Sequence, residues 1–166
     1  MHTQTKQSGG QYVDLRNLAV LVLDDNANTR TMISEVLRGL GVTRIYRAGT
    51  CTTGLAVLKA HPIDLVLADI EMDGEDGLGF ARLLRASPDP KMANMAIVIV
   101  SSHATEARVI EAGAIGANSF LSKPFTVAAF AKRLTDALVG RRMAVRPPAP
   151  HSIPPMPATA TLQLEI

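Results

Sequence analysis

The chain has 166 residues, of which 47% are hydrophobic and 19% charged, and its formal net charge is +2. These proportions are ordinary for one soluble globular domain, and no apolar run approaches the roughly 18 residues that a membrane span needs. The positive excess lies in residues 1–17 and 141–166, so the middle of the chain offers no basic patch for nucleic acid. Cys51 is the single cysteine, which excludes an internal disulfide and favours a reducing, cytoplasmic compartment.

Predicted strands and helices alternate along the chain. We expect residues 1–17 to form a flexible leader that lacks the apolar core of a signal peptide. Apolar runs that stop at polar or turn-forming residues predict strands at 18–23, 43–48, 63–69, 96–100 and 119–121. Apolar residues at helical spacing predict helices at 28–40, 52–60, 76–85, 105–112 and 126–140. The proline-rich tail, 141–166, cannot continue the last helix and is expected to be disordered.

Some helix ends and faces are also predicted. Asn28 is the expected N-cap of the first helix and Thr126 that of the last. The glycines from Gly113 to Gly116 are expected to end the helix that begins at Thr105. The last helix is expected to carry four apolar side chains on one face, namely Val127, Phe130, Leu134 and Leu138.

Five strands alternating with five helices predict an α/β fold. Strands separated by helices pair in parallel, through right-handed crossovers that cover both faces of the sheet. The continuous Leu/Val run at 63–69 is typical of a central strand that is buried on both faces. We therefore expect one doubly wound domain over residues 18–140.

Polar and charged residues follow the predicted strands at their carboxyl ends. In an open parallel sheet these ends meet at one crevice, where such folds bind their ligands. The carboxylates there could otherwise be only a solvated acidic surface. The residues at these strand ends are Asp24 and Asp25, Asp69, Ser101 and Ser102, and Lys123.

Three carboxylates in one crevice repel each other, at about 3 kcal/mol per pair for ~5 Å and an effective dielectric of ~20. Either one carboxyl group takes up a proton or a hard divalent cation binds, and Mg²⁺ suits a small site of oxygen ligands. The ammonium of Lys123 can pair with a carboxylate and then with a phosphoryl oxygen, and the hydroxyl of Ser101 can donate to another. Phosphoryl transfer to an aspartate requires these groups.

Four stretches of sequence resemble the receiver domain of response regulators in two-component signalling. They are VLVLDDN at 20–26, DLVLADIEMDG at 64–74, IVIVSS at 97–102 and GANSFLSKPF at 116–125. The resemblance implies a flavodoxin-like sheet with strand order 2-1-3-4-5. It also implies a stand-alone regulator, similar to the single-domain chemotaxis regulators, because little chain follows residue 140.

The resemblance implies a role for each matching position. Asp69 is implied to be the phosphoacceptor. The implied Mg²⁺ ligands are Asp24, Asp25, Asp69 and the backbone carbonyl of Glu71. The residues implied to stabilise the phosphoryl group and switch the surface are Ser101, Lys123 and Phe120.

Other positions matter through their size or their departure from the family pattern. Ser102 is small, as access to the phosphoryl group requires, and the Lys123–Pro124 bond is of a kind that is often cis in the family. The family usually has proline where this chain has Asp73, which predicts a looser or more acidic metal loop. In the family, the positions of Glu71 and His103 flank the path of the hydrolytic water. We expect the anionic Glu71 to slow self-dephosphorylation.

The resemblance also implies partners. They are a sensor histidine kinase or a histidine phosphotransfer protein, and a downstream protein target. The output face would comprise 105–112, 119–121 and 126–140, where a homodimer could also form. The apolar residues expected on that face are Val109, Ile110, Ala112 and Ala114 with Phe120.

Three other interpretations remain. A Mg²⁺-dependent phosphohydrolase with an aspartate nucleophile would need an Asp-x-Asp strand end and an inserted cap, and the sequence has neither. The chain could also be the receiver fragment of a larger, multidomain regulator. A dinucleotide-binding protein is disfavoured because no Gly-x-Gly-x-x-Gly follows the first strand.

Overall fold

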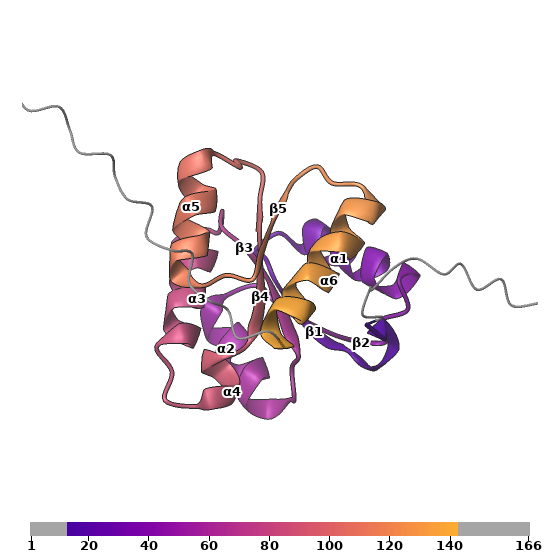
Figure 1. Ribbon diagram of the computed structural model, residues 1–166, viewed down its shortest axis with the longest axis horizontal. Coiled ribbons are helices and arrows are strands. Elements are labelled where there is room, and N and C mark those ends of the chain that lie inside the picture. Colours follow the sequence, from indigo (N-terminus) through magenta and orange to yellow (C-terminus); the bar gives the residue numbers. More distant parts are fainter. Residues whose placement is uncertain (1–12, 143–166) are drawn as a thin grey trace, which may run out of the picture.

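The computed structural model describes residues 13–142. Five strands form one parallel sheet in the order β2-β1-β3-β4-β5, which confirms the predicted doubly wound topology (Figure 1). The strands are β1 (Ala19–Leu23), β2 (Arg44–Ala48), β3 (Leu65–Asp69), β4 (Ala96–Ser101) and β5 (Ser119–Ser122).

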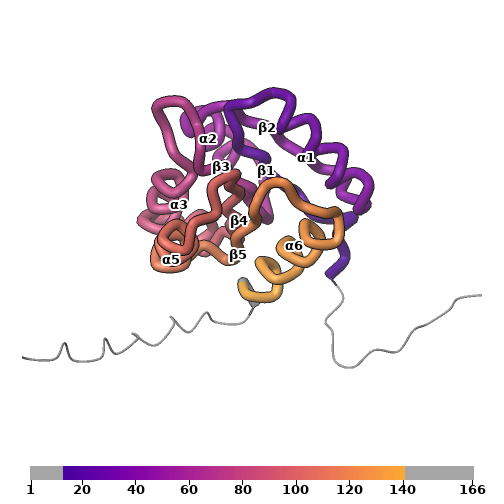
Figure 2. Tube along the Cα trace, turned by 90° about the horizontal axis from the view of Figure 1, so that it is seen from above, coloured from indigo at the N-terminus to yellow at the C-terminus, as the bar shows by residue number. Residues whose placement is uncertain are grey.

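Helices cover both faces of the sheet (Figures 1 and 2). One face is covered by α1 (Ala27–Gly39) and α6 (Val127–Arg142), and the other by α2 (Cys51–Ala60), α3 (Gly77–Arg85) and α5 (Glu106–Ile115). A one-turn helix, α4 (Pro90–Ala93), and a 3₁₀ turn, η1 (Leu15–Asn17), complete the described elements. No helix within residues 13–142 is long and apolar enough to cross a membrane.

The three central strands are buried along their whole length. Successive side chains of a strand point to opposite faces, so each strand contributes to two cores. Leu21 and Val66 pack with residues of α2, α3 and α5, whereas Val22 and Leu67 pack with residues of α1 and α6. The continuous apolar runs in the sequence therefore reflect a sheet that excludes water from both faces.

The structure corrects several predicted helix boundaries. The N-cap of α1 is Asn26 and not Asn28, because the Asn26 side chain accepts hydrogen bonds from the backbone amides of Asn28 and Thr29. Helix α5 continues through Gly113 and ends at Gly116, whose φ of 93° suits a residue without a Cβ.

A sixth helix, α4, was not predicted. The sequence around Pro90 was interpreted as a break after α3. In the structure Asp89 accepts a hydrogen bond from the amide of Lys91 and caps a new turn, with proline at its first position. Proline is compatible with the first turn of a helix because the amide that it lacks would have no partner there.

The predicted face of the last helix is partly wrong. Phe130, Leu134 and Leu138 are buried against the sheet as expected, but Val127 is 56% exposed. Its neighbour Ala128 is exposed as well. The spacing of apolar residues predicts their direction around the helix axis, but not the turn at which the helix first contacts the sheet.

The predicted leader and tail lie mostly outside the described residues. Within the leader, η1 forms at Leu15–Asn17, and Val13 and Leu15 pack against the core on the α1 and α6 side. The structure describes the tail only as far as Arg142, the last residue of α6.

Candidate functional site

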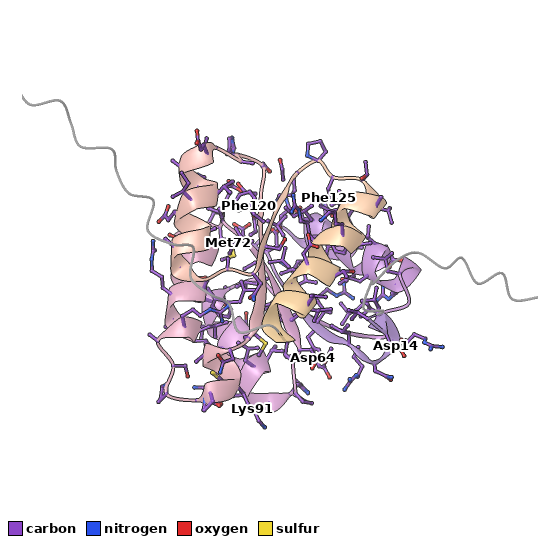
Figure 3. The ribbon with its side chains drawn as sticks, viewed as in Figure 1. Asp14, Asp64, Met72, Lys91, Phe120 and Phe125 are labelled. Atoms are coloured by element: carbon purple, nitrogen blue, oxygen red, sulfur yellow. The ribbon has the colours of Figure 1, made fainter. Side chains whose placement is uncertain are left out.

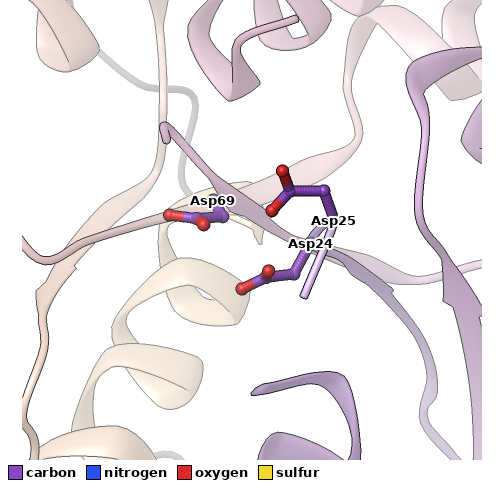
Figure 4. Close-up of side chains that lie close together, drawn as sticks. All are labelled: Asp24, Asp25 and Asp69. Carbon is purple, nitrogen blue, oxygen red and sulfur yellow. The ribbon is translucent and has the colours of Figure 1, made fainter. Parts of the chain in front are cut away.

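Three carboxylates meet at the carboxyl edge of the sheet, as the sequence predicts (Figure 4). Asp24 follows β1, Asp25 comes next, and Asp69 ends β3. Each offers an oxygen within 4.8 Å of the others. Asp24 and Asp69 are buried, while Asp25 is exposed. The site therefore has a buried floor and a side that is open to solvent.

Backbone amides hold two of these carboxylates in place. Asp24 Oδ1 accepts a hydrogen bond of 2.8 Å from the amide of Asn26, the residue that caps α1. Asp25 Oδ2 accepts a 2.8 Å bond from the amide of Asp73, in the loop after β3. Arg30 fixes the backbone here, since its Nη1 donates to the carbonyl of Asp24 over 2.6 Å.

The ammonium of Lys123 approaches the buried carboxylates from the loop after β5. Lys123 Nζ lies 3.4 Å from Asp69 Oδ1 and 3.7 Å from Asp24 Oδ2. The amide of Lys123 donates to the carbonyl of Ser101 over 2.8 Å, which anchors the lysine to the end of β4. The Lys123–Pro124 bond is cis. One cation thus faces two buried carboxylates.

Burial and mutual repulsion disfavour a negative charge on both buried carboxylates at once. Burial raises the pKa of Asp69 to about 7; the neighbouring charge of Asp24 adds to the rise, and Lys123 opposes it. Asp24 Oδ2 is buried and has no hydrogen-bond partner among the described residues. Negative charge therefore exceeds the positive charge that the protein itself supplies here.

A hard divalent cation fits this arrangement. The donor set consists of carboxylate oxygens, which Mg²⁺ prefers, and Asp24 Oδ2 is buried without a hydrogen-bond partner among the described residues. Asp25 is exposed, so the cluster is open to solvent on that side. The residues present are thus compatible with the predicted Mg²⁺.

Glu71 connects the site to the loop between β4 and α5. Its Oε1 accepts a hydrogen bond of 2.6 Å from the Ser101 hydroxyl and one of 2.7 Å from Arg108 Nη1. Its Oε2 accepts a 3.2 Å bond from the amide of Ser102. Burial alone would raise the pKa of Glu71, but the bonds from Ser101 and Ser102 and the charge of Arg108 outweigh it and hold the pKa at about 2.

Ser101 and His103 both contact Glu71. Ser101 is fully buried, and its hydroxyl donates to Glu71 while it accepts a 3.0 Å bond from the amide of His103. The imidazole of His103 is largely exposed, with Nδ1 3.4 Å from Glu71 Oε1. Ser102 is exposed and, with Lys123, lines a hollow of about 390 Å³ beside the site.

A glycine is required where α3 begins behind Asp69. A Cβ atom on Gly77 would lie 2.2 Å from the Asp69 carbonyl oxygen, so no side chain fits there. The preceding residue, Asp76, caps α3 by accepting a bond from the amide of Gly79. The start of α3 therefore supports the backbone that carries Asp69.

The predicted output face contains a groove of about 730 Å³ between α5 and α6. Its lining includes Val109, Phe120, Phe125, Ala129 and Arg133. Figure 3 shows Phe120 on the α5 side of β5 and Phe125 on the side of α6, where its ring centroid is 5.1 Å from that of Phe130.

The apolar residues predicted for this face divide in the structure. Val109 and Ile110 are 43% and 63% exposed, and Ala114 is exposed too. Ala112, in contrast, is 1% exposed and packs into the core. The prediction that Ala112 belongs to the exposed face is wrong, because Ala112 lies on the side of α5 that faces the sheet.

Sequence reasoning missed three groups of this site. They are Arg108, the amide of Asp73, and Gly77. A cation in the first turn of a helix, a backbone amide and a glycine leave no distinctive pattern in a sequence. Only the spacing of Gly77 after Asp69, at the expected start of a helix, could have indicated a close approach.

Comparison with known proteins gives a consistent result. The family model of the response regulator receiver domain matches residues 20–135. A probable chemotaxis protein CheY of Rhizobium etli is 36% identical over 110 residues, which cover 66% of this chain and 84% of that protein. Chemotaxis protein CheY-3 of Vibrio cholerae is 29% identical over 119 residues, or 72% of this chain and 90% of that protein.

A solved structure agrees with these sequence matches. The chemotaxis protein CheY4 of Vibrio cholerae superposes with a TM-score of 0.67 at 25% identity, and the match covers 73% of this chain and 98% of that one.

Proposed function

The chain belongs to the response regulator receiver domain family, and from this membership we propose that Asp69 accepts a phosphoryl group and thereby switches a protein-binding surface. One observation supports this proposal best. Asp69 is buried, faces the ammonium of Lys123, and lies beside two further carboxylates at one edge of the sheet. A stand-alone regulator of two-component signalling is the function that this combination supports.

The chemistry uses groups of this chain. A carboxylate oxygen of Asp69 attacks the phosphorus of a phosphohistidine and forms an O–P bond. The N–P bond breaks, and the imidazole leaves as a neutral ring that keeps the proton already on its other nitrogen. Lys123 Nζ, already 3.4 Å from Asp69 Oδ1, would hold a phosphoryl oxygen. Once its bond to Glu71 is broken, the Ser101 hydroxyl would donate a hydrogen bond to a second phosphoryl oxygen.

Asp24, Asp25, Asp69 and the backbone carbonyl of Glu71 would hold Mg²⁺. When bound, the cation neutralises charge on the carboxylates and on the phosphoryl oxygens. Asp25 is kept in position for this role by the amide of Asp73.

Phosphorylation would change the face formed by α5, β5 and α6. Phe120 lines the groove there and is only partly buried, so it has room to turn when Ser101 moves. A downstream protein target would bind this face, and a homodimer could also form through it. A cytoplasmic location stays a prediction. So does slow self-dephosphorylation of Asp69, which the anionic Glu71 is expected to cause. The phosphohistidine side chain of a sensor histidine kinase or phosphotransfer protein would reach Asp69 through the hollow beside Ser102 and Lys123.

Treatment with acetyl phosphate tests the proposal. We expect the intact mass to rise by one phosphoryl group per chain when Mg²⁺ is present, and not after chelation. Asp69→Asn should abolish the adduct, whereas Glu35→Gln, a change on the exposed side of α1, should retain it. A wild-type chain that takes up no phosphoryl group would contradict the proposal. Multiple turnover on a phosphoester would favour a phosphohydrolase instead.

A further inference from the structure

We propose that Glu71 and Arg108 form a latch that holds Ser101 in its resting position and so limits how readily Asp69 is phosphorylated. This inference rests on the proposed function and concerns its regulation. Glu71 and Arg108 act in it as positioning residues.

A single carboxylate joins two separate elements here. Glu71 follows β3, and its Oε1 receives both the Ser101 hydroxyl of β4 and Nη1 of Arg108 in the first turn of α5. The amide of Ser102 donates to the other oxygen, Oε2. Hydrogen bonds to an ionised carboxylate are the stronger ones in proteins. The end of β4 and the start of α5 are thus tied to the loop that carries the site.

The hydroxyl of Ser101 cannot serve two acceptors at once. It has one proton, and in the resting protein it donates this proton to Glu71 over 2.6 Å. Donation to a phosphoryl oxygen on Asp69 therefore requires that the bond to Glu71 breaks first. Every bond that keeps Glu71 in place opposes that exchange.

Arg108 keeps Glu71 in place from the side of α5. The side chain of Glu71 is 28% exposed, so without Arg108 it has space to turn towards solvent. The amide of Glu71 donates to Asp69 Oδ1 over 3.3 Å, so a phosphoryl group with a charge of roughly −2 would form close to the Glu71 carboxylate. The repulsion between these charges opens the latch, which frees Ser101 and the first turn of α5 together.

The sign of one substitution separates this latch from a simple charge effect. Removal of the Glu71 charge would speed the reaction with an anionic phosphodonor in either case. Removal of the Arg108 charge would slow it if only charge mattered. If Arg108 acts by holding Glu71, its loss releases Ser101 and speeds the reaction.

The experiment measures the rate of phosphorylation by acetyl phosphate at saturating Mg²⁺. We expect Glu71→Ala to raise this rate about tenfold, as loss of one charge-assisted hydrogen bond predicts. Arg108→Ala should raise it as well, and the double variant should be no faster than Glu71→Ala, because Arg108 acts only through Glu71. Slower or unchanged phosphorylation of Arg108→Ala would overturn the latch.

The pair Arg82 and Glu111 provides a matched control. This pair also joins an arginine to a carboxylate and involves α5. It links α3 to α5, however, and makes no hydrogen bond to Ser101. We expect Arg82→Ala and Glu111→Ala to leave the phosphorylation rate within twofold of the wild type. A rise equal to that of Arg108→Ala would show that any loosening of α5 suffices, and would overturn the specific role of Glu71.

Amide hydrogen exchange distinguishes failure of this inference from failure of the proposed function. It is measured without Mg²⁺ or phosphodonor, at the amides of Ser102 and His103, which the latch protects. Faster exchange in Glu71→Ala and in Arg108→Ala supports the latch, and unchanged exchange overturns it. If no variant, the wild type included, forms an adduct, the proposed function fails and the exchange result alone decides the latch.

Discussion

At the scale of single residues, the acidic cluster after β3 divides into separate tasks. Asp69 faces Lys123, Glu71 holds the β4–α5 loop, and Asp76 caps α3. Glu75 accepts a hydrogen bond of 2.8 Å from the amide of Cys51, at the start of α2. Asp73 contributes its backbone amide to Asp25. A run of acids in a sequence is therefore no measure of the charge that reaches a site.

The amide of Asp73 gives a prediction for Mg²⁺ binding. The resemblance to the receiver family implies that proline is usual at this position, and proline has no amide to donate to Asp25. Loss of a bond that orients a metal ligand commonly weakens metal binding by ten- to a hundredfold. We expect Asp73→Pro to bind Mg²⁺ about tenfold more weakly than Asp73→Asn, measured by isothermal titration calorimetry.

Asp73→Asn is the matched control for that comparison. It removes the same charge but keeps the amide, so the difference between the two variants reports the hydrogen bond alone. Equal affinities of the two variants would show that Asp25 does not need this bond to bind the cation.

At the scale of the elements, the end of β3 and the start of α3 are built as one unit. Asp76 caps the helix, and Gly77 lets its first turn approach the Asp69 carbonyl more closely than any other residue could. The position of Asp69 thus depends on a helix that begins eight positions further along the chain.

Gly77 gives a prediction about folding stability. Alanine is normally the better residue in a helix, by roughly 0.5–1 kcal/mol. At position 77 its Cβ would lie 2.2 Å from the Asp69 carbonyl oxygen, so either α3 or β3 must move. We expect Gly77→Ala to lower the free energy of unfolding by about 1–3 kcal/mol, measured by urea denaturation.

Gly113→Ala is the control for this effect. Gly113 lies inside α5, and a Cβ there would have no neighbour within 4 Å. This variant should gain up to about 1 kcal/mol. A gain at position 77 as well would mean that the contact between α3 and Asp69 relaxes without cost.

At the scale of the whole molecule, one edge of the sheet concentrates charge that the fold buries. The pKa of Asp69 is raised to about 7 from an ordinary value of 3.8, mainly by burial. The folded protein therefore binds a proton that the unfolded chain releases between these pH values. Global stability is thus tied to the functional site.

This linkage predicts how stability depends on pH. Without metal, Asp69 is protonated in both states below about pH 4, and it destabilises the folded state increasingly as the pH rises to about 7. We expect Asp69→Asn to exceed the wild type by a few kcal/mol in unfolding free energy at pH 8, and the gain to disappear towards pH 4. Urea denaturation in the presence of a chelator measures this difference.

Saturating Mg²⁺ provides the internal control. The cation binds the folded wild type and stabilises it by mass action, so the advantage of Asp69→Asn should shrink or reverse. A stability difference that stays constant across pH would show that Asp69 is not a strained anion in the folded protein.

The sequence by itself determined the order of the elements, the parallel sheet and the residues at its carboxyl edge. Apolar runs and helical spacing are local properties, and Asp24, Asp69 and Lys123 each follow such a run directly. In parallel strands those positions must meet, so the carboxylate cluster and its lysine could be predicted without coordinates.

Only the tertiary structure decided which groups these residues contact. The bond from Ser101 to Glu71, the approach of Arg108 and the clash that reserves position 77 for glycine all join segments that are separate in the sequence. The depth of Val127 and Ala112 was settled in the same way, by where the helices meet the sheet. Local patterns specify the direction of a side chain, whereas its partners depend on how the layers pack, and packing is a property of the whole chain.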